Sequence, residues 1–187
     1  MKLISFYSNE KQLLKRAIAS NREAQRTIYE KFAPKMLSVC RQYIRDIHFA
    51  EDVMVNGFVK VFKNLEKFEH RGSFEGWIRK IMVRESISYL RKKQFVVFDD
   101  EVVENKERVL EETTSVIDVE QVQQLIDALP EGYKMVFVLY AVEGYKHYEI
   151  AKMLEISEGT SKSQLFKARK MLQENLKLKG ITKTASQ

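Results

Sequence analysis

The chain has 187 residues, of which 44% are apolar and 31% charged, and its formal net charge is +6. This length allows one large domain or two small ones, and the apolar fraction is high enough to build a core, which excludes a chain disordered throughout. Only 7 Gly and 2 Pro occur, a balance that argues against sandwiches, barrels and collagen-like repeats and predicts an all-α fold.

The charge is distributed unevenly. Residues 1–93 hold 20 Lys/Arg and 10 Asp/Glu, net +10; residues 94–118 hold 2 and 8, net −6; residues 119–187 hold 10 and 8, net +2. We therefore predict two small helical domains, 1–93 and 119–187, joined by an acidic flexible linker, 94–118. The basic excess indicates either a solvated surface or a polyanion partner. The linker is either a self-repelling connector or an acidic strand that lies in a groove built for nucleic acid.

Cysteine usage and hydropathy indicate a reducing, aqueous compartment. Cys40 is the single cysteine, so no intramolecular disulfide and no multi-cysteine zinc site can form. The longest uncharged run, Met135 to Val142, is far shorter than the roughly 20 residues of a membrane span. The N-terminal residues carry no secretory h-region. We expect a cytoplasmic chain without membrane insertion.

Helical periodicity runs through the first domain. The first apolar stripe consists of Leu13, Leu14, Ala17 and Ile18. Asn21 can cap a second helix, and Pro34 suits the first turn of a third. A further stripe begins at Ala50 and continues to Leu65.

A loop and a long helix complete this domain. His70 to Ser73 form a predicted loop whose last residue caps a helix from Phe74 to about Lys93. One broad arc of that helix is apolar and includes Phe74, with Trp77 at its edge, and the cations Lys80, Arg84 and Arg91 share its flank. The two aromatic residues are either plain core or faces on which unpaired bases stack beside a cationic track for phosphates.

The second domain contains a helix, short turn, helix pattern. An apolar segment ends at Pro130, a helix from about Tyr133 to Val142 is followed by Gly144 as a C-terminal cap, and a final helix opens at Ser157 and runs past Leu172. The residues expected to project outward from the final helix are Ser161, Lys162, Gln164, Lys167 and Arg169. The pattern is either an ordinary helical hairpin or a helix-turn-helix that presents these residues to base edges and phosphates.

Three motifs, in order and with matching spacing, resemble a bacterial sigma factor of the sigma-70 family, of the short extracytoplasmic-function (ECF) type. AEDVMVNGFVKVFKNL (Ala50 to Leu65) is similar to the second-region helix that binds core polymerase. FEHRGSFEGWIRKIMVRESISYLRKK (Phe68 to Lys93) is similar to the adjoining promoter-melting segment. Leu129 to Leu172 resembles the fourth region with its helix-turn-helix. The likeness spans about residues 10 to 178.

The resemblance implies a promoter-specificity subunit, not an enzyme, that recognises the minus-ten and minus-thirty-five elements and helps to melt DNA. Its partners would be promoter DNA, core RNA polymerase through the beta-prime clamp helices and the beta subunit, and an anti-sigma factor. Implied polymerase contacts are Glu51, Asp52, Val53, Asn56 and Phe58. Implied minus-ten contacts are His70, Arg71, Ser73, Phe74, Trp77, Lys80, Arg84 and Arg91. Implied minus-thirty-five contacts are Gly159, Thr160, Ser161, Lys162, Gln164, Lys167 and Arg169.

The sequence departs from the family pattern at several of these positions. Val55 and Asn56 stand where the docking helix often has Gln and Glu, and Arg84 stands where the family usually places Asn. Ser161 and Gln164 replace Val and Arg, which removes a possible bidentate guanine reader or phosphate anchor. These differences bear on base preference.

Other chemistry is sparse. The three histidines share no metal-ligand spacing, and glycine-rich phosphate loops and triad patterns are absent, so we expect no catalytic residue, metal or cofactor. The remaining alternative is a free-standing regulator that binds duplex DNA through residues 146–170 and uses the front half for dimerisation or effector binding.

Overall fold

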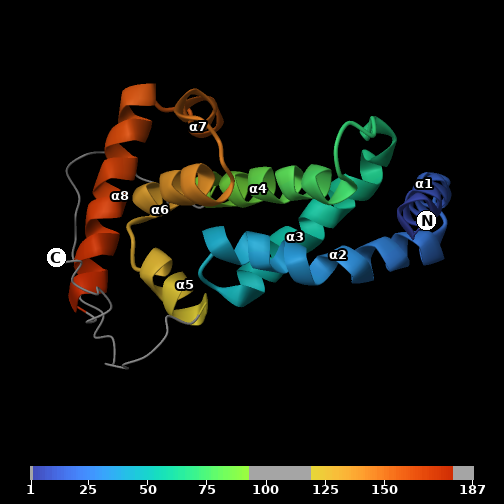
Figure 1. Cartoon of the computed structure of the whole chain (residues 1–187), viewed down its shortest axis with the longest axis horizontal. Coiled ribbons are helices and arrows are strands. Elements are labelled where there is room, and N and C mark those ends of the chain that lie inside the picture. Colours follow the sequence, from blue (N-terminus) through green and yellow to red (C-terminus); the bar gives the residue numbers. More distant parts are fainter. Residues whose placement is uncertain (1, 93–118, 179–187) are drawn as a thin grey trace. The chain divides into compact units, whose positions relative to one another are not determined.

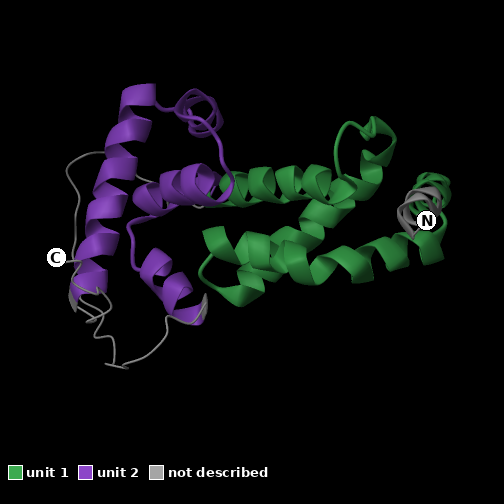
Figure 2. Ribbon diagram, in the orientation of Figure 1, with its two compact units in different colours: residues 1–90 green, residues 91–187 purple. Residues whose placement is uncertain are grey.

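A computed structural model describes residues 2–92 and 119–178, which form two compact units, Met1–Leu90 and Arg91–Gln187 (Figure 2). Every regular element in these residues is helical, which confirms the predicted all-α class. The predicted acidic linker, 94–118, lies outside the described residues.

The first unit contains four α-helices and one 3₁₀ turn, labelled in Figure 1: α1 (Lys2–Ile18), α2 (Arg22–Tyr43), α3 (Ile47–Lys63), η1 (Leu65–Lys67) and α4 (Phe74–Lys92). The predicted caps are confirmed. The Asn21 side chain accepts a hydrogen bond from the Ala24 amide at 2.9 Å, and Ser73 Oγ accepts one from the Gly76 amide at 3.1 Å. Each satisfies an amide at a helix start that has no partner within the helix.

The prediction that Pro34 begins a third helix is wrong, because α2 continues through it. Proline removes one backbone hydrogen bond and costs about 3 kcal/mol in a helix interior. Pro34 lies on the exposed side of α2, as does Glu30, whose carbonyl loses its partner and can bind water. On the opposite side Met36 and Cys40 are completely buried, so burial of the flanking turns outweighs this cost.

The core of the first unit lies between α2, α3 and α4. The stripe predicted from Ala50 to Leu65 is confirmed, since its apolar members Ala50, Val53, Met54, Val61 and Leu65 are all buried. Gly57 leaves room for the Met82 side chain of α4, because a Cβ atom built at Gly57 would overlap the Met82 Sδ atom. A Lys60–Glu85 ion pair of 2.6 Å joins the same two helices at the surface.

The second unit contains α5 (Val119–Asp127), α6 (Glu131–Phe137), the π-helical segment η2 (Val138–Val142), α7 (His147–Leu154) and α8 (Glu158–Leu178). Helix α8 packs on α6 and α7, with α7 near one end of α8 and α5 near the other (Figure 1). The predicted break at Pro130 and the turn at Gly144, which has a φ of 76°, are confirmed. The helix expected over residues 133–142 begins at Glu131 and ends in the π-helical segment.

Candidate nucleic-acid and polymerase interfaces

Helix α3 presents an exposed side that is both apolar and polar. We define the α3 outer face as Glu51, Asp52, Val55, Asn56 and Val59, all exposed. Val55 is 47% exposed and Val59 is 45% exposed. Burial, and then the carboxylates of Asp46 and Asp52, raise the pKa of Tyr89 on α4. Such a face, with an apolar centre and a polar rim, has the composition of a protein-binding surface.

Two residues implied to contact a partner from α3 lie in the core instead. Val53 is 4% exposed and Phe58 is 2% exposed. The Phe58 ring packs edge-on against Tyr29 of α2, with their centroids 4.9 Å apart. The structure therefore removes Val53 and Phe58 from the candidate contacts, and Val55 and Val59 provide the accessible apolar surface that they were expected to supply.

The loop before α4 is supported by a cluster of aromatic rings. Phe74, at the start of α4, lies 5.1 Å from Phe68 and 5.6 Å edge-on from Phe32 of α2, centroid to centroid. Trp77 stacks on Phe74 at 5.9 Å with an interplanar angle of 17°, and it is partly exposed. Phe74 itself is buried, which agrees with the core alternative for this ring, so Phe74 is not available to bases and instead packs against Trp77.

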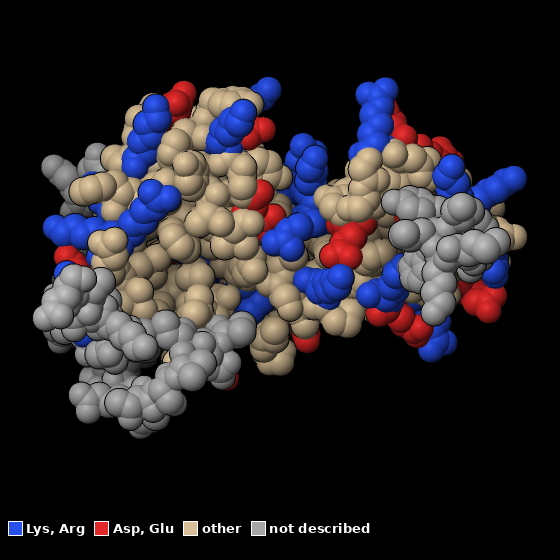
Figure 3. Space-filling model, in the orientation of Figure 1, with Lys and Arg blue, Asp and Glu red and all other residues tan. Residues whose placement is uncertain are grey.

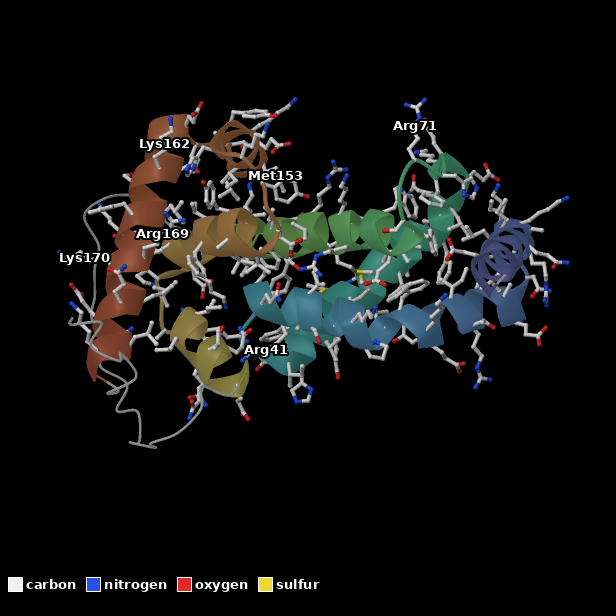
Figure 4. The ribbon with its side chains drawn as sticks, viewed as in Figure 1. Arg41, Arg71, Met153, Lys162, Arg169 and Lys170 are labelled. Carbon is white, nitrogen blue, oxygen red and sulfur yellow. The ribbon has the colours of Figure 1, made fainter. Side chains whose placement is uncertain are left out.

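The polar residues of this loop are accessible. His70, Arg71 and Ser73 are all exposed, and Arg71 projects away from the helices (Figure 4). His70 has a φ of 57° and Gly72 a φ of 98°, which turn the chain sharply between η1 and α4. The expected cations Lys80, Arg84 and Arg91 are likewise exposed along α4.

Helices α7 and α8 form the expected helix-turn-helix. Glu155 adopts the left-handed conformation at the turn, with a φ of 58°, and Ser157 Oγ accepts a hydrogen bond from the Thr160 amide at 2.9 Å, which caps α8. The two helices are held together by buried apolar residues, Ile150, Leu154, Leu165 and Ala168. This packing fixes which side of α8 is accessible.

The α8 outer face consists of five exposed residues, Gly159, Lys162, Phe166, Arg169 and Lys170. Lys162, Arg169 and Lys170 are labelled in Figure 4, and Figure 3 shows Lys and Arg side chains projecting from the visible surface of both units. The prediction of outward projection is wrong for Ser161, 0% exposed, and Gln164, 1% exposed. Both lie on the inner side of α8 with Leu165 and Ala168.

Thr160 and Lys167 take intermediate positions. Both are half-buried, and the Lys167 ammonium lies 6.0 Å from the centre of the Tyr133 ring of α6. A cation above an aromatic face is attracted by the ring electrons. Lys167 thus lies at the flank of the α8 outer face.

Sequence reasoning missed Phe166, which is 71% exposed in the middle of the α8 outer face. The available signal was its position on the helix, because a residue one place after Leu165 and two before Ala168 cannot share their inward direction at helical spacing. An exposed phenylalanine flanked by cations can contact a thymine methyl group while the cations bind phosphates.

An acidic side chain, Glu158, lies in the first turn of α8. The Glu158 carboxylate pairs with the Lys162 ammonium at 2.8 Å, and this hydrogen bond, followed by the charge of Lys162 and a smaller contribution from His147, lowers the pKa of Glu158. Both members are at least half exposed, so the pair contributes little to stability. It can open when a phosphate competes for Lys162.

The described residues offer no candidate metal site. No group of three or more His, Cys, Asp or Glu side chains there could hold a metal ion. Within the same residues, no helix is long and apolar enough to cross a membrane. Burial raises the pKa of the Cys40 thiol to about 11, so this cysteine is an uncharged core residue at neutral pH.

Comparison with family models matches both units. Residues 28–96 match the model of Sigma-70 region 2, and residues 119–172 match the model of Sigma-70, region 4. The region 2 match assigns the front helices to a sigma region, against the alternative of a regulator's dimerisation or effector domain.

Curated relatives and a solved structure agree. The ECF RNA polymerase sigma factor SigW of Bacillus subtilis is 26% identical over 181 residues, covering 89% of this chain and 96% of the relative. The RNA polymerase sigma-H factor of Pseudomonas aeruginosa is 23% identical over 180 residues, covering 89% and 93%. The fold resembles that of the sigma factor RpoE from Bartonella quintana, solved in complex with the anti-sigma factor NepR, with a TM-score of 0.53, 21% identity and coverage of 82% and 96%.

The two regions, their order and the length of the match lead to one assignment: this chain belongs to the sigma-70 family and is an ECF sigma factor, a non-catalytic subunit that directs RNA polymerase to promoters.

Proposed function

We propose that this sigma factor divides its work among three surfaces. The α3 outer face binds the beta-prime clamp helices of core polymerase. The loop at residues 70–73, with Trp77 and the cations of α4, holds the separated strand of the minus-ten element. The α8 outer face reads the minus-thirty-five element. The observation that carries the proposal is the exposure of Val55 and Val59 between polar residues on α3.

The chemistry of α3 favours a protein partner. Two valines, each nearly half exposed, lie on a helix whose other side is packed in the core. Burying them against a partner removes apolar surface from water, at roughly 25 cal/mol per Å². Glu51, Asp52 and Asn56 border the valines and can pair with cations or amides of the partner, which sets the register of binding.

Co-elution with purified core polymerase tests this surface. Val59→Asp places a charge on the apolar part of the α3 outer face without entering the core, and we expect it to abolish co-elution. Ile18→Asp is the matched control, because Ile18 is 40% exposed but lies on α1. If both variants co-elute like the wild type, or both fail, α3 is not the docking surface.

The minus-ten surface favours melting by capture. Extruding a base from a duplex costs a few kcal/mol, and stacking it on an aromatic side chain returns about 1–3 kcal/mol. Trp77 is partly exposed and braced by Phe74 and Phe68, so its ring is available and fixed in direction. Nearby Lys80 and Arg84 supply charge for the strand's phosphates. Such a site holds DNA open without consuming ATP.

The minus-thirty-five surface favours duplex DNA in the major groove. The α8 outer face combines three cations with one exposed aromatic ring on a helix whose register is fixed by α7. Cations bind phosphates independently of sequence, whereas apolar contacts and hydrogen bonds to base edges distinguish base pairs.

The remaining assignments complete the proposal. Residues 1–93 and 119–187 act as the two sigma domains, with 94–118 as the linker, and the second domain also contacts the beta subunit. The α3 outer face is free to bind an anti-sigma factor when polymerase is absent, because its apolar residues are exposed. The protein then acts in the cytoplasm, where polymerase and promoters are found.

A further inference from the structure

One aromatic ring of the second unit lies between two cationic or ionisable partners. The Tyr140 ring stacks on the His147 imidazole of α7, with centroids 4.6 Å apart and an interplanar angle of 25°. The Arg169 guanidinium of α8 lies 5.5 Å from the centre of the same ring. Tyr140 therefore contacts both helices of the helix-turn-helix, although it precedes them in the chain.

The π-helical segment accounts for the position of Tyr140. In η2 the Glu143 amide donates to the Val138 carbonyl at 3.0 Å, one residue farther back than in an α-helix, and Val138 and Leu139 are both fully buried. The wider turn changes the direction of the residues that follow these two anchors. Isolated π-helical turns occur frequently at functional sites.

A partly buried hydrogen bond links His147 to α8. His147 Nδ1 lies 2.9 Å from Ser161 Oγ, and Ser161 is completely buried. His147 opens α7, and Ser161 is in the first turn of α8, so the bond joins the N-terminal ends of the two helices. Losing the imidazole would leave the buried Ser161 hydroxyl without this partner, which costs free energy and makes the arrangement specific.

Arg169 is held by the ring and not by a carboxylate. It is exposed and forms no ion pair with any described residue, and the acid on the same helix face, Glu158, is paired with Lys162. A guanidinium that rests its plane on an aromatic ring keeps its N–H groups at the edge available for hydrogen bonds. The Arg169 guanidinium thus keeps N–H groups available to a DNA phosphate or base, while the Tyr140 ring restricts its orientation.

We propose that Tyr140 and His147 are positioning residues for minus-thirty-five recognition: His147 fixes α8 through Ser161, and Tyr140, braced by His147, aims the Arg169 guanidinium at the DNA. This inference rests on the proposed role of the α8 outer face. Neither positioning residue needs to touch DNA.

The test uses holoenzyme assembled from the full chain and core polymerase, on a promoter that the wild type selects from a randomised library. Affinity is measured as a function of salt concentration. Arg169→Gln should weaken binding and lower the salt slope by about one unit. Tyr140→Leu should reproduce most of both changes, whereas Tyr140→Phe, which keeps the ring, should stay within about twofold of wild type.

A double-variant cycle separates positioning from general packing. If Tyr140 acts through Arg169, Tyr140→Leu should have little further effect in the Arg169→Gln background. If Tyr140→Leu weakened DNA binding equally in the wild-type and Arg169→Gln backgrounds, the inference would be overturned. It would also be overturned if Tyr140→Leu weakened binding without changing the salt slope. His147→Phe keeps a ring against Tyr140 but removes the bond to Ser161, and an unaltered affinity would overturn the role of His147.

Folding is followed by thermal unfolding of each variant. If Tyr140→Leu unfolds below the assay temperature, Tyr140→Met, with a longer side chain, takes its place in the same cycle. A wild-type holoenzyme whose affinity ignores the minus-thirty-five sequence would overturn both the proposed role of α8 and this inference. Weakening by Arg169→Gln without weakening by the Tyr140 variants would overturn the inference alone.

Discussion

The outer faces of α3 and α8 are built on the same principle and differ in chemistry. Each helix buries one apolar side in its own unit, Ala50 and Val61 on α3, Leu165 and Ala168 on α8. The exposed side of α3 offers valines bordered by acids and an amide, whereas that of α8 offers cations around Phe166. The inner side determines the fold, and we propose that the chemistry of the outer side determines whether the partner is a protein or DNA.

Trp77, in the first unit, predicts an effect on open-complex formation that does not depend on salt concentration. Trp77→Ala removes the ring proposed to hold the extruded base. We expect it to destabilise the open complex by roughly 1–3 kcal/mol and to leave binding to core polymerase unchanged. Permanganate reactivity at the promoter measures it, and Trp77→Phe should restore part of it. Unchanged reactivity in Trp77→Ala would contradict melting by capture.

The inner side of α3 predicts a stability effect. Gly57→Ala inserts a methyl group where the end of the buried Met82 side chain already lies, so that side chain must move within the core. We expect a destabilisation of about 1–3 kcal/mol, measured by denaturant unfolding. Asn56, the exposed residue that precedes Gly57, provides the control. Asn56→Ala should keep the free energy of unfolding within about 0.5 kcal/mol of the wild type. If Gly57→Ala were as stable as the wild type, the core would not require the space that Gly57 leaves for Met82.

The lysines of the α8 outer face predict a change in DNA affinity that depends on salt concentration. Lys162→Gln together with Lys170→Gln should lower the salt slope of DNA binding by up to about two units and weaken all sequences alike. Lys11→Gln, on an exposed cation of α1, is the control and should leave the slope unchanged. A changed sequence preference with an unchanged slope would instead place these lysines at base edges.

Phe166 predicts the smallest and most specific change. If its ring contacts a thymine methyl group, Phe166→Ala should cost about 1 kcal/mol at one base pair and leave the salt slope unaltered. Selection from a randomised minus-thirty-five element would show a relaxed preference at that position. A uniform loss at every position would indicate that the ring only supports the helix.

Local chemistry predicted much of this fold. Asn21 and Ser73 are helix caps because their side chains reach amides a few residues away, and the stripe from Ala50 to Leu65 is buried because its spacing is helical. The exceptions depend on contacts distant in sequence. Pro34 stays inside α2 because the adjacent turns are buried, and the π-helical segment had no local signal.

The candidate sites were predicted less completely, for one physical reason. Polar residues were expected outside, yet Ser161 is buried because His147, fourteen residues earlier, provides its hydrogen bond. Phe58 was expected at a partner because of the family resemblance, yet it is buried, and Phe166, which is exposed, was overlooked. Exposure follows from the packing of neighbouring helices, which residue type alone does not reveal.

The central claim is that the α3 outer face binds core polymerase and the α8 outer face recognises the promoter, so that this chain determines where the polymerase initiates. Run-off transcription with purified core polymerase on a randomised promoter library tests it most directly. The account predicts transcripts that start only when this chain is added, from templates sharing two spaced elements, and none with Val59→Asp. Transcription that does not depend on the chain, or tight operator binding by the chain alone with no effect on polymerase, would contradict it.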